Sequence, residues 1–169
     1  MSTLASPTRP HAQLRAALGM FPTGVTIVTT AGPEGRPMGL TVNSFNAVSL
    51  DPPLVAWSLN NGSRSRAAFE RADAFAIHVL AAGQQALAQR FAAKLDDPFD
   101  QIGWRGGCAG VPLIDGAAAV FECRVHARVD GGDHVLYLGR VERFNYQLER
   151  APLVFASGRF CHSPLPLSD

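Results

Sequence analysis

Apolar and polar positions along the chain follow two periods, one typical of helices and one typical of strands. Between His11 and Phe21 apolar residues recur every three to four positions, which predicts an amphipathic helix that Pro22 and Gly24 end. Runs rich in apolar and β-branched residues predict strands. The expected strands are 25–30, 38–44, 47–50, 54–59, 75–80, 117–129, 134–144 and 154–160.

Turn residues and two further helical segments decide how these strands connect. Gly-Pro-Glu-Gly at 32–35 and Asp-Gly-Gly-Asp at 130–133 predict hairpins, and helices are expected over 64–72 and 84–93. The segment 96–110 is rich in Gly and Asp and predicts an irregular, mobile loop that lies over a site. Hairpins with helices inserted between them favour a mainly β fold with flanking helices, a closed antiparallel barrel.

Composition narrows the class of protein. The chain has 169 residues, 47% hydrophobic and 17% charged, which fits one folded domain and excludes disorder as its main state. We expect that domain at 11–161, with a disordered lead at 1–10 and a tail at 162–169. A net charge of +1 gives no reason to expect nucleic acid or an anionic membrane as a partner.

Several patterns that the sequence lacks indicate where the protein is located and whether it binds a metal. No apolar stretch approaches the roughly 20 residues of a membrane-spanning helix, and the N-terminus has no secretory signal pattern. The three cysteines are widely spaced, which predicts free thiols in a reducing cytoplasm. The spacing of His, Asp and Glu predicts no metal site.

Three polar segments are candidates for chemistry. The first, 39–53, carries small hydroxyl and amide side chains at a strand end, where they would bind the polar edge of a planar heterocycle or simply satisfy loop backbone groups. The second, 58–66, runs from a strand into a helix. Its serines, its two arginines and the helix N-terminus would hold a phosphate, or else form a capped helix start with solvated arginines.

The third segment is Gly132-Asp133-His134 in a hairpin. Its imidazole would contact a substrate, orient a cofactor or exchange a proton, or its polar groups would bond only to the local turn. His78 lies within an apolar strand and is expected to be a hydrogen-bonded core or interface residue.

Four motifs in order carry a resemblance to a known family over about residues 11–161. They are FPTGVTIVT at 21–29, the segment 39–53, the Gly-Asp-His turn at 132–134, and APLVF at 151–155 with GRF at 158–160. In these motifs the chain resembles the short-chain flavin reductases, the reductase partners of two-component flavin-dependent monooxygenases.

The resemblance implies an FMN-binding split β-barrel, a homodimer with flavin sites near the subunit interface, and a reaction. In that reaction NADH, or NADPH, reduces FMN or FAD, which then leaves for a separate monooxygenase. Residue by residue, it places 41–45 along the isoalloxazine ring, with 22–23 beside the ring and 49–50 as a continuation. The residues concerned are Pro22, Thr23, Thr41, Val42, Asn43, Ser44, Phe45, Ser49 and Leu50.

The remaining site residues also follow from the resemblance. Ser58, Asn60, Ser63 and Arg66 fall in the segment that handles the ribityl chain and phosphate, and His134 corresponds to the family's histidine on the nicotinamide side. Arg159 and Phe160 match the closing motif. Many relatives have Tyr where this chain has Phe160, so stacking is retained there without a hydroxyl.

A site of Ser, Thr, Asn and backbone groups suits hydride transfer between two cofactors, because the cofactors carry the chemistry. The chain has no dinucleotide fingerprint, which fits a nicotinamide cofactor bound over the flavin. Two alternatives stay open. One is a flavoprotein that keeps its flavin and reduces another acceptor, and the other is a flavin-binding module without turnover. The flavin preference and the kinetic order are not fixed by the sequence.

Overall fold

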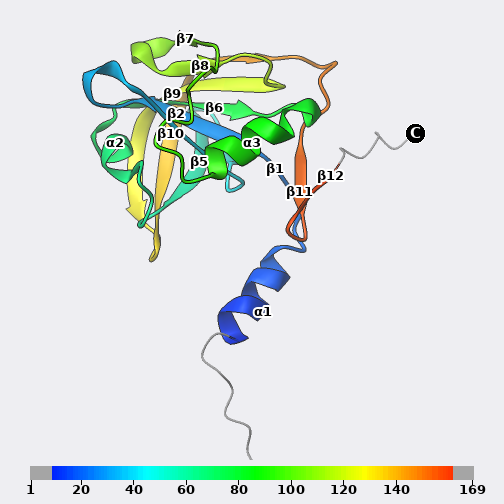
Figure 1. Cartoon of the computed structure of the whole chain (residues 1–169). Helices are drawn as coiled ribbons and strands as arrows, with labels where there is room; N and C mark the ends of the chain where they lie inside the picture. The colour runs from blue at the N-terminus through cyan, green and yellow to red at the C-terminus, as the bar shows by residue number, and fades with distance from the viewer. Residues whose placement is uncertain (1–8, 162–169) are drawn as a thin grey trace, which may run out of the picture.

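A seven-stranded antiparallel sheet forms the body of the protein in a computed structural model that describes residues 9–161 (Figure 1). In space its strands follow the order β3-β2-β6-β9-β10-β5-β4. Their bounds are β2 (Thr26–Ala31), β3 (Pro37–Val42), β4 (Asn46–Leu50), β5 (Pro53–Asn60), β6 (Ala74–Val79), β9 (Ala119–Asp130) and β10 (His134–Tyr146).

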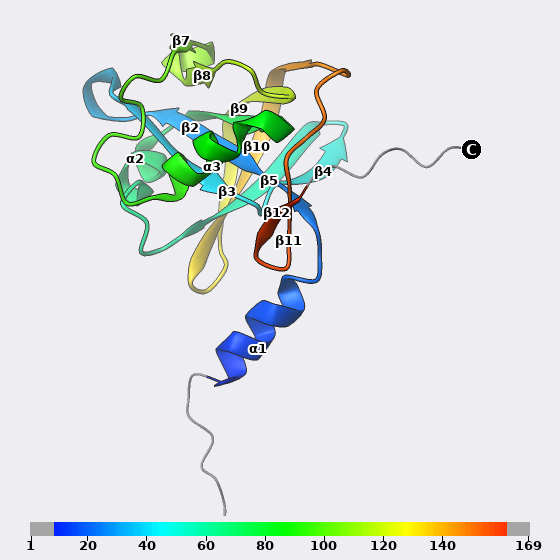
Figure 2. The ribbon, with the colours of Figure 1, turned by 45° about the vertical axis from the view of Figure 1, so that its right-hand side comes forward.

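Smaller elements surround this sheet. A three-stranded sheet and a two-stranded hairpin comprise β1 (Thr23–Gly24), β11 (Val154–Ala156) and β12 (Arg159–Cys161), and β7 (Trp104–Gly106) and β8 (Pro112–Ile114). The α-helices are α1 (Arg9–Leu18), α2 (Arg66–Arg71) and α3 (Gln85–Ala92), and the 3₁₀ turns are η1 (Pro33–Gly35), η2 (Ala82–Gln84) and η3 (Cys108–Gly110). Helix α3 lies across the sheet, while α1 extends away from it (Figures 1 and 2). No helix that the structure describes is long and apolar enough to cross a membrane.

The link between β3 and β4 forces the sheet to curl. These two strands are the opposite edges of the sheet, yet only residues 43–45 connect them. So short a link spans at most roughly 14 Å, so the two edges must lie close together. The Ser44 hydroxyl at this link accepts a hydrogen bond from the Ser58 backbone N–H at 2.9 Å. Among the described residues no ladder joins β3 to β4, so the barrel is split at this seam rather than closed as the strand pattern alone predicts.

Aromatic side chains fill the barrel. Trp57 of β5 stacks on Tyr137 of β10 with ring centroids 4.8 Å apart, and Phe69 of α2 and Phe75 of β6 meet Trp57 edge-on at 5.0 and 5.7 Å. These four side chains are almost completely buried. A second apolar cluster, which includes Phe91 of α3, lies between that helix and the sheet. Burial of this kind is the main favourable term in folding.

His78 is a structural residue in the core, as the sequence predicts. Its Nδ1 lies 3.0 Å from the carbonyl oxygen of Ile27, and its Nε2 accepts a hydrogen bond from the backbone N–H of Ile114 at 3.1 Å. Both bonds are satisfied by a neutral ring protonated at Nδ1. The ring therefore joins β6 to β2 and to β8. Burial lowers the pKa of His78 to about 4.

Three expectations need correction. The terminal strand 154–160 is two strands, because Ser157 and Gly158 turn the chain in the left-handed region with φ of 49° and 77°. The 96–110 loop is less irregular than its composition suggests, since β7 within it pairs with β8. The first helix ends at Leu18, where a turn that includes Gly19 replaces its last residues.

We expect His78 to make stability fall as the solution is acidified. The native pKa is about 4 and the unfolded value is about 6.5, so the unfolded chain binds more protons between these values. Stability is therefore lost as pH falls below about 6.5. From pH 6.5 to 5 the free energy of unfolding should fall about 2 kcal/mol more in the wild type than in His78→Gln, measured by urea unfolding.

The exposed His126 supplies the matched control, because His126→Gln should keep the wild-type slope. Equal slopes in the wild type and in His78→Gln would contradict the buried, neutral assignment of His78.

Candidate functional site

Two neighbouring cavities run along β3 and α3 and form one groove. One has a volume of about 460 Å³ and the other about 380 Å³, within the range of small-molecule sites. Thr41, Ala92 and Ala93 line both cavities. We call the first the apolar end and the second the cationic end of this groove.

Two contacts hold α3 against β3. The Thr41 hydroxyl donates a hydrogen bond to the carbonyl oxygen of Ala88 at 2.7 Å. At Gly39 a Cβ atom would lie 3.1 Å from the Phe91 ring and 3.2 Å from the Val28 carbonyl oxygen, so a glycine lets the helix approach the strand. These contacts fix the position of α3 against β3 along the groove.

The apolar end is lined by hydrophobic side chains from four elements or their flanks. Phe155 and Phe160, from the β11–β12 hairpin, meet edge-on at 5.3 Å and form one side with Val25. Val42 and the α3 residues form the rest, and the exposed Asn43 amide lies at the same cavity. Apolar walls with the amides of Asn43 and Gln89 suit a planar heterocycle that has a polar edge.

The cationic end lies beside the loop between β5 and α2. Ser63, Arg64 and Ser65 line it, together with Arg36 and Lys94 from other segments. Asp96 and Asp97 also line this cavity, so the cations are partly balanced. Guanidinium and ammonium groups are the usual protein partners of a phosphate.

The Gly-Asp-His turn packs against the same loop. His134 pairs with Asn60 across the β10–β5 ladder. Asn61 binds the turn twice, through its backbone N–H to the Asp133 carbonyl at 2.9 Å and through its side-chain amide to the Gly132 carbonyl at 2.8 Å. The structure thus places the histidine motif next to the cationic loop, although the two are distant in sequence.

Asp133 orients the histidine ring. Nδ1 of His134 lies 2.7 Å from Oδ1 of Asp133, and this hydrogen bond holds the pKa of the Asp133 carboxyl below its usual range. The ring itself is partly exposed and lines neither end of the groove.

Five predicted residues line the groove and the others lie outside its lining. Thr41, Val42, Asn43, Ser63 and Phe160 are in the first group. The residues outside the lining are Pro22, Thr23, Ser44, Phe45, Ser49, Leu50, Ser58, Asn60, Arg66 and Arg159.

Some residues outside the lining already have partners within the chain. Phe45 stacks on Phe121 at 5.6 Å, and the Asn60 side chain accepts a hydrogen bond from the Gly62 N–H at 2.8 Å. The Thr23 hydroxyl, in contrast, is buried without a hydrogen-bond partner. The roles that the sequence assigns to these residues remain predictions.

Sequence reasoning missed the wall that α3 forms and, at the cationic end, Arg36 and Lys94. Ala88, Gln89 and Ala92 of α3, and the loop that follows α3, carry no recognisable motif. Arg90 explains the path of that loop, because its guanidinium donates to the carbonyl oxygens of Pro98 and Asp100, each at 2.7 Å. The Gly- and Asp-rich composition of 96–110 was the signal available for that loop, and three of its residues, Asp96, Asp97 and Pro98, line the cavity.

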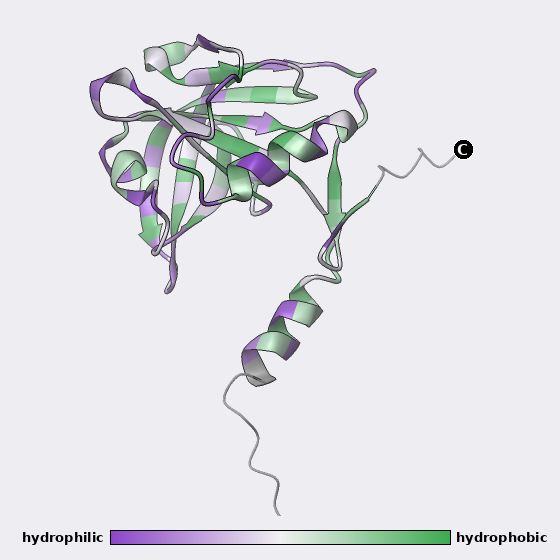
Figure 3. Ribbon diagram, viewed as in Figure 1, coloured by the Kyte–Doolittle hydropathy of each residue, from purple (hydrophilic) through white to green (hydrophobic). Residues whose placement is uncertain are grey.

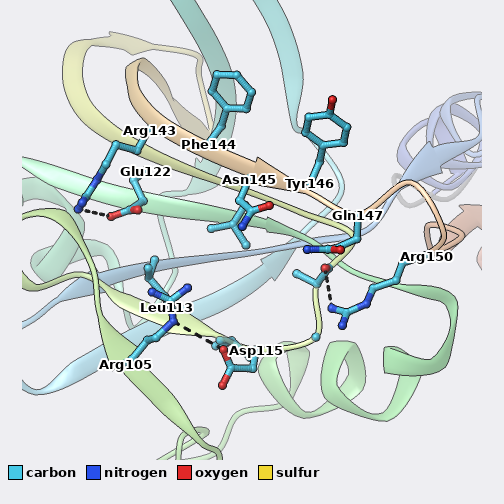
Figure 4. Close-up of a pocket in the computed structure, with 14 residues that line it drawn as sticks. Arg105, Leu113, Asp115, Glu122, Arg143, Phe144, Asn145, Tyr146, Gln147 and Arg150 are labelled. Atoms are coloured by element: carbon cyan, nitrogen blue, oxygen red, sulfur yellow. Dashed lines mark hydrogen bonds and ion pairs between the residues drawn. The ribbon is translucent and has the colours of Figure 1, made fainter.

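A cavity of about 480 Å³ lies elsewhere, beside the second half of β10 (Figure 4). Its charged groups already have partners within the chain: Arg143 pairs with Glu122 at 2.9 Å, Arg105 pairs with Asp115 at 3.8 Å, and Arg150 donates a hydrogen bond to the Ala117 carbonyl oxygen at 3.2 Å. None of the predicted site residues lines it. We therefore take the groove along β3 and α3 as the candidate site.

Comparison with protein families identifies the chain. The model of the flavin reductase like domain matches residues 18–164. The chain belongs to this flavin reductase family. The resemblance predicted from the four motifs is confirmed, as is the mainly β, split-barrel fold class.

Curated relatives of this flavin reductase are themselves named as reductases. This chain is 49% identical over 146 residues to the FMN reductase (NADH) SmoA of Agrobacterium fabrum, and the match covers 86% of this chain and 82% of the relative. It is 40% identical over 148 residues to the reductase subunit HsaB of a flavin-dependent monooxygenase from Rhodococcus jostii, covering 88% and 75%. Three further relatives are longer proteins, of which the chain spans 42 to 57%.

A solved relative shares the whole fold. The structure of the NADH:FAD oxidoreductase SgcE6 of Streptomyces globisporus, in complex with NAD and FAD fragments, superposes with a TM-score of 0.88. Identity is 40%, and the match covers 99% of this chain and 100% of the other. Flavin and NADH therefore recur as the cofactors of this flavin reductase's relatives.

The residues of the groove fit a flavin. Its apolar end offers aromatic and aliphatic walls with an exposed amide, and its cationic end offers arginine and lysine side chains near serine hydroxyls. A flavin mononucleotide has the matching order of groups, a planar ring joined by a short polar chain to a phosphate. Asn43 and Phe160 would hold the ring, and Ser63 and the neighbouring cations would hold the phosphate.

We expect Thr41 to act mainly by fixing α3 to β3. Thr41→Val removes the hydroxyl and leaves the Ala88 carbonyl without that donor, so unfolding free energy should fall by about 1 kcal/mol, measured by urea unfolding. Thr41→Ser keeps the donor and should recover most of that loss. Equal stability of the valine variant and the wild type would show that this hydrogen bond does not secure the wall.

Proposed function

We propose that the protein transfers hydride from NADH to FMN or FAD and supplies the reduced flavin to a separate monooxygenase. The observation that carries the proposal is the groove, whose apolar and cationic ends match the two ends of a flavin nucleotide. The family match and the names of the NADH-dependent relatives support the same reaction. The reductase subunit HsaB supports a monooxygenase as the recipient.

In this reaction the protein's own residues bind and orient. The bound cofactors supply the hydride and its acceptor. Val42, Phe155 and Phe160 would exclude water from one side of the ring, and Asn43 would bind its polar edge. Asp133 would keep the His134 ring oriented for a contact with the nicotinamide nucleotide. Such positioning is the main contribution that a protein makes to a transfer between two bound groups.

A partly open groove favours a flavin that comes and goes. Exposed residues such as Asn43, Arg36 and Lys94 line it, so the site is not sealed from solvent. In the single chain, this exposure supports the proposal over a flavoprotein that keeps its flavin for another acceptor. It also fits a flavin that leaves reduced to serve another enzyme.

Aerobic NADH oxidation with added FMN, FAD or riboflavin tests the reaction. We expect the purified protein to oxidise NADH at a rate that rises and saturates with added flavin. Filtration after turnover should recover the flavin in the filtrate. A flavin that stays with the protein would favour the tightly bound alternative, and no oxidation with any flavin or with NADPH would favour a binding module.

His134→Ala tests the nicotinamide side of the site. We expect kcat to fall roughly tenfold to hundredfold because the nicotinamide is no longer held in position, while the flavin dissociation constant stays within about twofold. Stopped-flow kinetics of flavin reduction and flavin fluorescence titration measure the two quantities. His126→Ala, an exposed histidine away from the turn, is the control. Unchanged turnover in His134→Ala would remove His134 from the mechanism.

We also propose a homodimer, supported by the apolar surface that the single chain leaves exposed. Helix α1 stands apart from the barrel and carries apolar residues along one side (Figure 3). On and after that helix, Leu14, Leu18 and Phe21 are 58, 65 and 75% exposed, and Phe144 on β10 is 66% exposed. Large apolar side chains gathered on one exposed helix are typical of interaction sites.

A charge on the apolar side of α1 should separate the subunits. We expect sedimentation to report a dimer for the wild type and a monomer for Leu14→Glu/Leu18→Glu, because a buried unpaired carboxylate is costly. Ala16→Glu adds a charge on the opposite side of the same helix and should leave the dimer intact. A monomeric wild type would refute the homodimer.

We place the flavin reductase in the cytoplasm. The three cysteines, Cys108, Cys123 and Cys161, are free thiols, as a reducing compartment favours.

A further inference from the structure

The Gly-Asp-His turn ends the long β9–β10 hairpin, whose tip projects beyond the neighbouring strands (Figures 1 and 2). Within the turn, the Gly131 N–H donates to the His134 carbonyl at 2.9 Å, and the Gly132 N–H donates to Oδ1 of Asp130 at 3.0 Å. Gly131 and Gly132 carry no side chain, so the backbone here is intrinsically free to change conformation. The position of this turn therefore depends on contacts from outside the hairpin.

Asn61, in the loop between β5 and α2, supplies two such contacts. Its backbone N–H donates to the Asp133 carbonyl at 2.9 Å, and its side-chain Nδ2 donates to the Gly132 carbonyl at 2.8 Å. These two donors on one residue bind the two peptide groups that flank Asp133, so they fix its rotation as well as its position. Asp133 in turn binds the His134 ring at 2.7 Å.

Asn61 is itself held in place. Nη1 of Arg66 donates to the Asn61 carbonyl at 3.3 Å, and the adjacent Asn60 pairs with His134 in the β5–β10 ladder. Within residues 9–161, Oδ1 of Asn61 is buried and has no hydrogen-bond partner. A buried unpaired oxygen costs free energy. Stability alone therefore does not explain an asparagine here, and the part of its side chain that is used is the NH₂ group.

Asp133 and Asn61 act on the histidine in different ways. The Asp133 carboxylate is 86% exposed and belongs to the same turn as the ring, so this pair moves with the turn. Asn61 belongs to a different segment, in which Ser63, two residues further along, lines the groove. Asp133 thus orients the ring within the turn, whereas Asn61 sets where the turn lies relative to the groove.

We propose that Asn61 is a positioning residue, which holds the Gly-Asp-His turn so that the His134 ring meets the nicotinamide nucleotide. The proposal rests on the proposed function, since that function gives His134 its contact with the nicotinamide nucleotide. Hydride transfer needs its donor and acceptor close together and aligned, so a small displacement of a group that holds the nicotinamide slows the reaction. Asn61 acts through the turn and contacts neither cofactor.

Asn61→Ala removes the bond to the Gly132 carbonyl and leaves the backbone bond to Asp133. We expect flavin reduction at saturating NADH to slow about threefold to tenfold because the ring is less well placed, while the FMN and riboflavin dissociation constants stay within about twofold. Unchanged flavin binding would also show that the loop and the groove are folded. Stopped-flow kinetics and flavin fluorescence titration measure these quantities.

An isosteric variant and a matched control make the result specific. Asn61→Asp keeps the size of the side chain but replaces the donor with an acceptor facing the Gly132 carbonyl, so it should slow flavin reduction at least as much as Asn61→Ala. Asn145→Ala removes an exposed asparagine from the second half of β10 and should keep the wild-type rate.

A double variant separates positioning from a general structural effect. His134→Ala/Asn61→Ala should reduce flavin at the rate of His134→Ala alone, because Asn61 acts only through that ring. A residue with a merely structural role would slow the reaction by the same factor in both backgrounds.

A wild-type rate in Asn61→Ala, or an equal loss in both backgrounds, would overturn the proposal while the role of His134 stands. A wild-type rate in His134→Ala would refute the nicotinamide contact of His134, and the role of Asn61 would fall with it. A wild type that oxidises no NADH with any flavin would instead refute the proposed function.

Discussion

The three-residue link between β3 and β4 is the constraint on which the structure depends. It joins the two edges of one seven-stranded sheet, and so short a link cannot cross a flat sheet of that width. The sheet must curl until its edges meet, and the residues of the link then lie at the seam. Asn43 is one of them, so the same constraint that shapes the barrel presents an amide at the groove.

The groove itself comes from elements that are added to the barrel. Helix α3 covers β3 because Gly39 leaves space and Thr41 supplies a hydrogen bond, and the β11–β12 hairpin adds two aromatic rings. The cationic end is assembled from the β5–α2 loop and the segment after α3. A rigid barrel thus carries the residues of the candidate site on its loops and attached elements, an arrangement common among binding proteins.

Sequence reasoning predicted most elements because their signals are local. The apolar run of β5 and the turn at Asp130 follow short-range rules, and both elements form where expected. The hydrogen bonds of His78 were foreseen because a histidine in an apolar strand needs partners. The family motifs located the groove through Asn43 and Phe160.

What sequence reasoning could not predict depends on contacts between distant segments. That Arg64 faces a cavity depends on Arg36 and Lys94 from other segments, whereas the pairing of Arg66 with Glu70 is a local i,i+4 contact whose spacing is visible in the sequence. The alanines of α3 line the groove only because the helix lies on β3. The central claim is that this groove is the flavin site, and a crystal structure with FMN tests it most directly. The account predicts the ring beside Asn43 and Phe160, whereas a ring in the cavity between Arg105 and Tyr146 would contradict it.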